Sequence, residues 1–340
     1  MNSQNGNLKS HEERKYIGMT LDPVHIGTGG YRLGRVDNTI ARDPTTKLPI
    51  LFGSSLEGTA RTYSAYRLIE SDKSTKAIQE KIKETYKKNG KLILRKDYLD
   101  CAGKSDEETG KRVQCGECEI CVTYGFSKKG KSLHGMAQFS DADILFFPVH
   151  TMIGPAWITC PRILNDFGLQ ETVSKDKIKT GLTDQGKKLN LGWLYLENEG
   201  KITSNMNGFP DVPPEILGKI VIVSDNLFSQ IVNSNLEVRT SVSIDPKTGA
   251  AEEGALFTYE AIPRATIMYF TVTYLNPNNF NVDGVEFKDD NEEKRPPRMD
   301  DVIRTVNGGI TLFEYLGIGG MNTRGFGRFK ILNLGDNNGK

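Results

Sequence analysis

Four cysteines in one stretch of the chain could together hold a metal ion. Cys115, Cys118 and Cys121 form a C-x2-C-x2-C run, and zinc prefers a tetrahedral set of sulfur and nitrogen ligands. The fourth ligand is either Cys101, fourteen residues upstream, or His134, thirteen residues downstream. Cys101 is the preferred choice because thiolates favour soft metal sites. The alternative is a loop of reduced cysteines without metal, and nothing indicates an open, catalytic zinc position.

Asp37 is the carboxylate that we single out as a candidate for catalysis. It lies in the sequence GRVDNTIARDP, between Arg35 and Arg42. On local sequence the simplest interpretation is an ion-paired loop residue. The functional interpretation is a carboxylate held near an RNA phosphate, by itself or through Mg²⁺, where it would help a ribose 2′-OH attack the adjacent phosphorus.

The third candidate is a glycine-rich loop near the C-terminus, in the sequence YLGIGGMNTRGFGRFKILNL. Its glycines could form only a sharp turn, or they could cradle a phosphate with backbone N–H groups. A dinucleotide fingerprint is excluded, since it needs a strand before the glycines and a helix after them. Here the residues before Gly317 look helical and residues 329–334 look strand-like. With Arg324 and Arg328 beside the glycines, a nucleic-acid backbone is a better ligand than a cofactor.

The elements that must position these residues begin with a predicted strand at 16–21. The connection at 22–49 carries Asp37, and a loop of that length in a compact domain is usually functional or disordered. Ser54 or Ser55 then caps a predicted helix with apolar residues at helical spacing. The apolar positions are Leu56, Ala60, Tyr63 and Leu68.

A protruding β-hairpin is predicted at 236–262, because apolar and polar residues alternate there and DPKTG signals a turn. A hydrophobic central strand follows at 265–274, and a helix at 300–316, broken at Gly308–Gly309, leads into the glycine-rich loop. The remaining predictions are a polar insertion at 72–133, two short strands or one bent strand at 135–149, a helix at 157–167, a poorly periodic segment at 170–218, a strand at 220–223 and a helix at 225–233. This order indicates an α+β fold around one mixed or antiparallel sheet, compatible with a ferredoxin-like core that carries insertions.

Bulk composition limits the kind of function. The chain has 340 residues and a net charge of +1, so nucleic-acid binding must depend on local patches. No apolar run approaches the roughly 18 residues that a membrane span needs. The five cysteines, without a secretory signal at the N-terminus, indicate a reducing cytoplasm. His25 and His150 are interpreted as structural histidines, and Cys160 as a buried core thiol.

Together these pieces resemble the RAMP-superfamily backbone subunit of type III CRISPR RNA-guided effector complexes, most of all its type III-B, or Cmr, branch. Five segments carry the resemblance in family order: 21–29, 34–61, 139–164, 237–263 and 317–328. The stretches FSDA…AWITCP and VRTxVxID…EEGALF look specific to the Cmr branch, whereas the glycine-rich loop alone would not be.

The resemblance implies a ferredoxin/RRM-like palm and a protruding β-hairpin "thumb". The sequence itself adds large insertions, one of which is the predicted zinc-binding insertion. Within a single domain at 1–340, the palm corresponds to 16–71 and 135–167, the insertion with the cysteine cluster to 72–134, and the thumb region to 220–264. The second part of the palm, with the glycine-rich loop, corresponds to 265–334.

The resemblance also implies a repeated subunit that stacks head to tail along a guide RNA and cuts single-stranded target RNA at regular intervals. The thumb would wedge into the guide–target duplex, an action that suits Val242, Ile244 and Pro246 near its tip. Cleavage would need Mg²⁺ or another divalent metal and leave a 2′,3′-cyclic phosphate. The partners would be further copies of the chain and other type III effector subunits, with no membrane.

Site residues follow from the same resemblance. The active aspartate matches Asp37. Guide-binding positions match Ser54, Ser55, Arg61, Arg239, Thr240, Gly319, Gly320, Arg324 and Gly325. The alternative is a non-catalytic guide-binding filament subunit of a type III-A or other CRISPR complex.

The chain departs from the family pattern at two places. Glu57 stands where relatives commonly carry lysine, and a carboxylate there would repel phosphate. The cysteine cluster is more typical of other RAMP backbone subunits, including the type III-A branch, than of the Cmr branch. The near-neutral net charge suggests that affinity is shared among many copies and the guide.

Overall fold

The computed structural model describes residues 9–28, 36–71, 101–103, 114–128, 130–280, 282, 287–288 and 294–334. Most of the predicted insertion at 72–133 lies outside these residues. The chain divides into two compact units. Unit 1 comprises Met1–Lys15, Gly53–Ser140 and Thr271–Leu312, and unit 2 comprises Tyr16–Phe52, Asp141–Phe270 and Phe313–Lys340.

Unit 2 is built on a mixed β-sheet with the strand order β16-β1-β13-β5-β6-β10-β7-β9-β8. The pairs β6–β10 and β7–β9 are parallel, whereas β5–β6, β8–β9 and β1–β16 are antiparallel. The α+β class with a large mixed sheet is therefore confirmed. The strands are β1 (His11–Thr20), β5 (Asp143–Thr151), β6 (Gly154–Thr159), β7 (Lys177–Thr180), β8 (Lys188–Leu191), β9 (Leu194–Gly200), β10 (Ile220–Val223), β13 (Ile267–Leu275) and β16 (Phe329–Ile331).

Short helices follow two parallel strands of this sheet. α5 (Pro161–Asn165) comes directly after β6, and α7 (Asp225–Ser234) comes directly after β10. Two further short helices are α6 (Pro214–Leu217) and α9 (Phe313–Leu316). The strand at 220–223 and the helix at 225–233 were predicted correctly.

The prediction of a helix at 157–167 was wrong for its first half. Residues 156–159 are buried; 156–158 pair with β5 on one side, and 157–159 pair with β10 on the other. Two-sided pairing of an apolar segment outweighs its helical spacing, and the helix starts only at Pro161. The segment at 170–218 contains β7, β8 and β9, which its many charged residues concealed.

Unit 1 contains two packed helices, α1 (Gly53–Ser71) and α8 (Met299–Thr311). The predicted break at Gly308–Gly309 was wrong, since α8 runs through both glycines. A Cβ on Gly309 would lie 2.4 Å from Ala60 O and from Ser64 Oγ, so glycine is needed there for close helix packing. The remaining elements are α4 (Glu119–Tyr124), β2 (Gly125–Lys128), β3 (Lys131–His134), β4 (Ala137–Phe139), β14 (Phe287–Lys288) and β15 (Lys294–Arg295).

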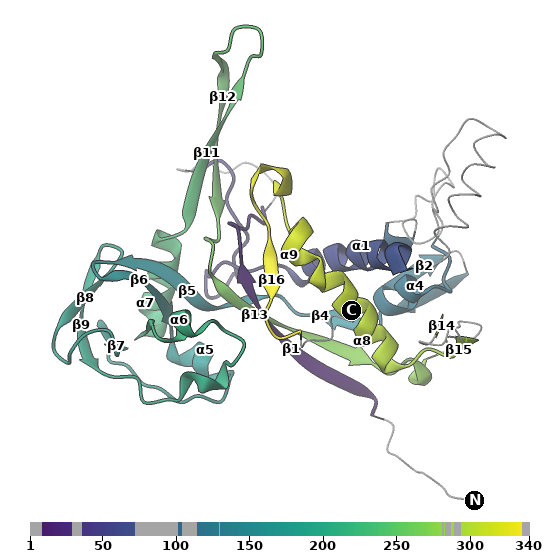
Figure 1. The fold of residues 1–340 in the computed structure, drawn as a ribbon, viewed down its shortest axis with the longest axis horizontal. Helices are drawn as coiled ribbons and strands as arrows, with labels where there is room; N and C mark the ends of the chain where they lie inside the picture. The colour runs from purple at the N-terminus through teal and green to yellow at the C-terminus, as the bar shows by residue number, and fades with distance from the viewer. Residues whose placement is uncertain are drawn as a thin grey trace, which may run out of the picture. The chain divides into compact units, whose positions relative to one another are not determined.

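The predicted hairpin is confirmed as β11 (Glu237–Ile244) and β12 (Ala251–Ala261), which form a two-stranded ribbon of unit 2 (Figure 1). At its turn, Asp245 accepts hydrogen bonds from the backbone of Lys247 and from Thr248 Oγ1. Several large apolar side chains of the ribbon are more than a third exposed: Val238, Val242, Ile244, Leu256 and Phe257. The ribbon therefore presents apolar surface that its own strands do not cover.

Side chains from the sheet of unit 2 fix the root of this hairpin. Ala265 adopts a left-handed conformation (φ 63°) between β12 and β13. The Trp157 indole donates to Ala265 O at 2.7 Å, and the Thr20 and Thr266 hydroxyls donate to Pro263 O at 2.8 and 2.7 Å. The direction of the hairpin is thus set by the buried sheet.

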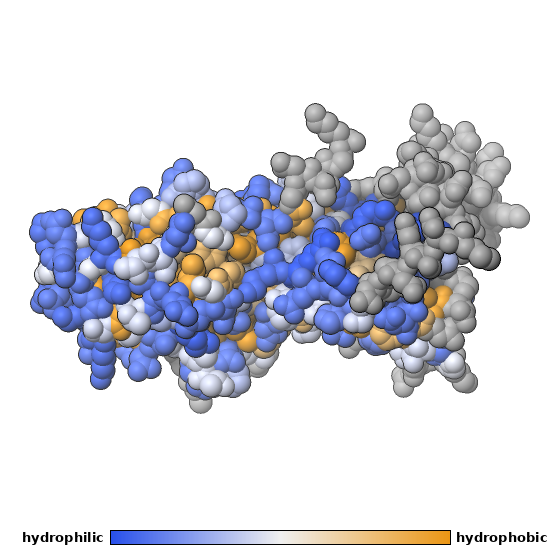
Figure 2. All heavy atoms as spheres, turned by 90° about the horizontal axis from the view of Figure 1, so that it is seen from below, coloured by the Kyte–Doolittle hydropathy of each residue, from blue (hydrophilic) through white to orange (hydrophobic). Residues whose placement is uncertain are grey.

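Hydrophilic residues cover most of the face shown in Figure 2, and hydrophobic ones show between them. Among the described residues, no helix has both the length and the hydrophobicity that crossing a membrane requires.

Candidate RNA and metal sites

Asp37 lies on a segment that runs beside β12. Asn38 forms a parallel bridge with Tyr259, and backbone hydrogen bonds join Asn38 N to Thr258 O and Glu260 N to Asn38 O, both at 3.0 Å. Asp37 Oδ2 accepts from Thr258 N at 2.9 Å and from Thr258 Oγ1 at 2.8 Å. One carboxylate oxygen is therefore fixed by the hairpin strand, and Oδ1 accepts no hydrogen bond from the described residues.

The environment of Asp37 keeps it charged. The backbone and hydroxyl hydrogen bonds from Thr258 lower the pKa of this carboxyl below its ordinary value. A carboxylate with a low pKa is a weak proton acceptor but a good ligand for a cation. The Asp37 side chain is thus suited to holding a divalent ion or fixing a hydroxyl, more than to removing a proton by itself.

The simple ion-pair interpretation of Asp37 does not hold for Arg42. Arg42 donates instead to Glu260 Oε1 at 2.6 Å and to Asn233 Oδ1 at 2.8 Å. Glu260 also accepts from Ile40 N at 3.1 Å. Sequence reasoning missed both Thr258 and Glu260, although their spacing of two residues on β12 was the available signal. Arg35 lies outside the described residues.

His25 is buried, and its backbone supports the glycine-rich loop. Its Nδ1 lies 2.7 Å from Glu260 O, and its ring packs edge-on against Tyr259. Gly320 N donates to His25 O at 2.9 Å. A Cβ on Gly319 would lie 2.5 Å from the same carbonyl oxygen, so this close approach requires glycine. The Gly320 N–H is therefore used inside the fold.

The exposed part of the glycine-rich loop contains Arg324 and Gly325. The observed order is helix α9, loop, strand β16, as predicted from the sequence. Gly319, Gly320, Arg324 and Gly325 are all exposed. Among the described residues, the Arg324 side chain has no ion pair or hydrogen bond, so its guanidinium group is available to a ligand.

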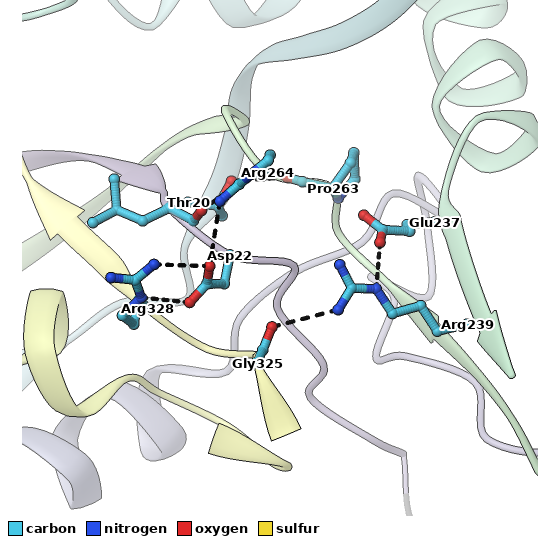
Figure 3. A network of polar contacts seen from close by, with 9 residues as sticks. Thr20, Asp22, Glu237, Arg239, Pro263, Arg264, Gly325 and Arg328 are labelled. Carbon is cyan, nitrogen blue, oxygen red and sulfur yellow. Dashed lines mark hydrogen bonds and ion pairs between the residues drawn. The ribbon is translucent and has the colours of Figure 1, made fainter. Parts of the chain in front are cut away.

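Arg239 joins the hairpin to this loop (Figure 3). Its Nε donates to Glu237 Oε1 at 2.6 Å, a terminal nitrogen lies 3.5 Å from Gly325 O, and the guanidinium carbon lies 4.9 Å from the centre of the Phe326 ring. Thr240 is exposed and lies opposite Thr258 on the ladder. The structure thus brings Arg239, Thr240 and the Asp37 segment to one part of unit 2.

The start of α1 presents exposed Ser54 and half-buried Ser55, with no acidic residue in the first turn. Arg61, which was predicted to bind guide RNA, makes contacts inside unit 1. It is 13% exposed and donates to the carbonyl oxygens of Cys101, Tyr124 and Gly125, at distances from 2.7 to 3.3 Å. Burial raises the pKa of Glu57. Arg61 therefore ties α1 to the cysteine segment.

The four predicted cysteine ligands converge in unit 1. The Sγ atoms of Cys101, Cys115, Cys118 and Cys121 all lie within 4.8 Å of one another. Backbone N–H groups of residues 115 to 118 point at these sulfurs, at 3.2 to 3.4 Å. Such donors stabilise bound thiolates. The cluster can hold a metal, and its all-sulfur donor set fits a soft ion.

His134, the other predicted fourth ligand, is not part of this cluster. Its ring packs edge-on against Phe280, with 4.7 Å between ring centres. Cys160 lies apart from the cluster in the buried core of unit 2, where burial and a hydrogen bond to Asp225 raise its pKa to about 12. This matches its interpretation as a core thiol.

Comparisons with known proteins agree with these observations. The model of the RAMP superfamily matches residues 19–330. A protein of Pyrococcus furiosus named "CRISPR system Cmr endoribonuclease Cmr4" is 26% identical over 335 residues, which cover 92% of each chain. Among solved structures, a chain of the type III-B Cmr-beta complex bound to cognate target RNA matches with a TM-score of 0.57 and 14% identity, over 95% of this chain and 98% of that one. Oligomeric Cmr4 from Pyrococcus furiosus matches with a TM-score of 0.50 and 20% identity, over 95% and 98%.

The matches to solved structures have low sequence identity and support the fold alone. The match to the family model spans residues 19–330 and supports membership of the family. The resemblance predicted from the glycine-rich loop, the hairpin and the Asp37 segment is confirmed. The chain belongs to the RAMP superfamily.

Proposed function

We propose that this chain is a repeated backbone subunit of a type III-B CRISPR ribonucleoprotein, which binds guide RNA and cleaves complementary target RNA. The observation that carries the proposal is the full-length similarity to a relative named as a Cmr endoribonuclease. The family match and the fold of a chain in a Cmr complex with target RNA support it. Further copies of the chain and other effector subunits would be its partners, in the cytoplasm.

Asp37 is the residue that we assign to cleavage. Its carboxylate is ionised, is held by Thr258 at one oxygen, and offers the other oxygen to a ligand. A divalent ion such as Mg²⁺ would supply charge neutralisation at the scissile phosphate. The 2′-OH of the preceding ribose would lose its proton to water as its oxygen bonds to phosphorus. The bond to the 5′-oxygen breaks, and that oxygen takes a proton from water, which leaves a 2′,3′-cyclic phosphate and a 5′-OH. Asp37 would orient the 2′-OH or hold the ion.

We assign guide contacts to the start of α1 in unit 1 and, separately, to the glycine-rich loop in unit 2. Ser54 and Ser55 lie at a helix N-terminus, where backbone N–H groups attract phosphate. Arg324, Gly319 and Gly325 lie on an exposed part of the loop. Gly320 supports the loop, and Arg61 supports the cysteine segment, so any contact of these two residues with RNA is secondary to a role inside the fold.

We assign residues 16–71, 135–167 and 265–334 to a ferredoxin/RRM-like palm, and the region 220–264, with the hairpin β11–β12, to the thumb. The exposed apolar side chains of Val242 and Ile244 suit a wedge between bases. We assign structural zinc to the four cysteines, since a small segment with little core of its own gains stability from a metal. Base pairing by the guide would supply sequence specificity, while the protein contacts backbone and shape.

The test is cleavage by the assembled complex. Asp37→Ala and Asp37→Asn should reduce cleavage of labelled complementary RNA in Mg²⁺ by at least about a hundredfold, while assembly and target binding stay intact. Asp43→Asn is the matched control. Asp43 lies in the same loop, but its carboxylate bonds the backbone of Thr45 and Thr46 in a turn.

A complex whose Asp37 variants still cut at every thumb position would make this chain a scaffold, with cleavage done elsewhere. A wild-type complex that binds guide and target RNA but does not cut the target would support the same non-catalytic alternative. Either result would remove the enzymatic part of the proposal and keep the RNA-binding part.

A further inference from the structure

In unit 2 the carboxylate of Asp22 pairs with Arg264 and Arg328, and a third arginine, Arg239, bonds Glu237 and Gly325 in the same view (Figure 3). Asp22 follows β1, and Arg328 precedes β16 and grips both Asp22 oxygens through Nε and a terminal nitrogen. Arg264, at the root of the hairpin, has a terminal nitrogen 3.5 Å from Asp22 Oδ1 and donates from Nε to Leu21 O at 3.0 Å. Arg239, on β11, is close enough to lower the pKa of Asp22.

The Asp22 side chain is largely buried, whereas the arginine side chains near it are exposed. The Asp22 side chain is 13% exposed, whereas Arg264 is 68%, Arg328 is 48% and Arg239 is 41% exposed. Counting Glu237, the partner of Arg239, the cluster holds three positive and two negative charges. The groups that the cluster exposes to solvent are therefore mainly guanidinium groups, and the Asp22 carboxylate lies beneath them.

Each arginine keeps donors for a ligand. In the part of the chain that the structure describes, one terminal nitrogen of each of Arg239, Arg264 and Arg328 has no acceptor. Exposed ion pairs contribute little to folding stability, so stability alone does not explain why Arg264 and Arg328 share one acid. Guanidinium groups held in place bind phosphate with two parallel hydrogen bonds.

We propose that Arg239, Arg264 and Arg328 form a binding site for the phosphodiester backbone of RNA, and that Asp22 is the positioning residue that holds Arg264 and Arg328 in place. The inference rests on the proposed function. It adds Arg264, Arg328 and Asp22 to Arg239, which the family resemblance already gave as a guide-binding position. Because Asp22 already fixes two guanidinium groups, less side-chain entropy is lost when phosphate binds. The site also explains how a chain with a net charge of +1 can bind a polyanion locally.

The first experiment measures binding of the full-length chain to a fluorescein-labelled single-stranded RNA of mixed sequence over a series of salt concentrations. Arg264→Ala and Arg328→Ala should each weaken binding roughly tenfold. Each should also flatten the dependence of log affinity on log salt by about 0.7, the value for one phosphate contact on a single strand. Lys187→Ala removes the same charge from an exposed pair with Asp184 in the same unit and should change neither.

The second experiment separates positioning from simple charge. Asp22→Asn makes the chain more positive, so a purely electrostatic role of Asp22 predicts tighter RNA binding. Positioning predicts weaker binding, with most of the loss restored by Asp22→Glu. Tighter binding by Asp22→Asn would overturn the positioning role.

The outcomes keep this inference apart from the proposed function. If the wild-type chain binds RNA and both arginine variants keep its affinity and salt dependence, the site is wrong and the proposed function stands. If the wild-type chain does not bind RNA alone or in the assembled complex, the proposed function itself fails. Should Arg328→Ala fail to fold, Arg264→Ala carries the test, since its side chain makes only exposed contacts.

Discussion

At the scale of single residues, the candidate active site depends on how a hairpin strand holds Asp37. The acid was predictable from its loop and its family segment. Thr258, which fixes it, is 221 positions away along the chain. No local pattern connects the two residues, because only strand pairing brings them together. The same reason explains why the pairing of Asp22 with Arg328, 306 positions away, was not found from sequence.

The low pKa of Asp37 predicts a specific pH dependence. Its folded pKa lies below 3.8, so the carboxylate keeps its charge as the pH falls until that lower value is reached. Between about pH 5 and pH 8, Asp37 should therefore contribute no acidic limb to the single-turnover cleavage rate. Any rise of rate with pH in that window must come from the 2′-OH or a metal-bound water.

Thr258→Val tests the cause of this shift. The variant loses the hydroxyl hydrogen bond but keeps the backbone N–H, so the pKa of Asp37 should move up toward its ordinary value and stay acidic. We expect cleavage to fall by about tenfold through loss of orientation, with the pH profile unchanged in shape. An inflection near neutral pH that disappears in Asp37→Asn would contradict this account.

At the scale of elements, sequence patterns succeeded where one surface of an element decides its structure. Strict alternation and DPKTG identified the hairpin, and the four apolar residues of IVIV identified β10. The sequence patterns failed where the structure of a segment depends on its packing against an element that is distant in the sequence. The segment at 157–159 is a strand because β5 and β10 pair with it, and α8 continues through two glycines because α1 lies against it.

The two glycines of α8 should respond in opposite ways to alanine. Gly309→Ala would place a Cβ 2.4 Å from Ala60 O and should destabilise the protein by about 2–3 kcal/mol, as overpacking does. At Gly308 the nearest atoms are 3.8 Å away, on the Arg67 side chain. Gly308→Ala should therefore stabilise by about 0.5–1 kcal/mol through helix propensity. Urea unfolding of the two variants measures both effects, and equal shifts in the same direction would disprove the packing argument.

We expect the stability of the cysteine segment to depend on that of α1, because Arg61 on α1 bonds the backbone of that segment. We expect zinc in equimolar amount to the freshly purified, reduced protein, and its loss with Cys118→Ala. Arg61→Ala leaves three carbonyl oxygens without their donor and should cost about 2 kcal/mol.

A matched control for Arg61 is Arg14→Ala in the same unit, because Arg14 is far more exposed, at 41%. Metal analysis of the two variants and their melting temperatures provide the readout. Zinc-free protein that melts at the same temperature as the native protein would eliminate the structural metal.

At the scale of the whole molecule, the net charge of +1 means that no general attraction brings RNA to the chain. In the proposed function, binding would come from local cations such as Arg324 and the arginines near Asp22, and each copy in the proposed filament would repeat them. Multiple weak contacts along one guide give strong combined affinity. Length and composition indicated this from the start, but the position of the cations required the fold.

The thumb should act only in the assembled complex, where guide and target form a duplex. Val242 and Ile244 are 45% and 51% exposed, so changing both to serine should leave the melting temperature of the isolated chain nearly unchanged. If they separate bases, the double variant should reduce unstacking of 2-aminopurine placed at the thumb positions of the target, and reduce cleavage there about tenfold. Guide binding should not change, since the arginines and the glycine-rich loop remain. Lys247→Ala, at the polar turn of the same hairpin, is the control. Full cleavage with normal 2-aminopurine fluorescence in the double variant would show that the apolar tip covers protein instead of entering the duplex.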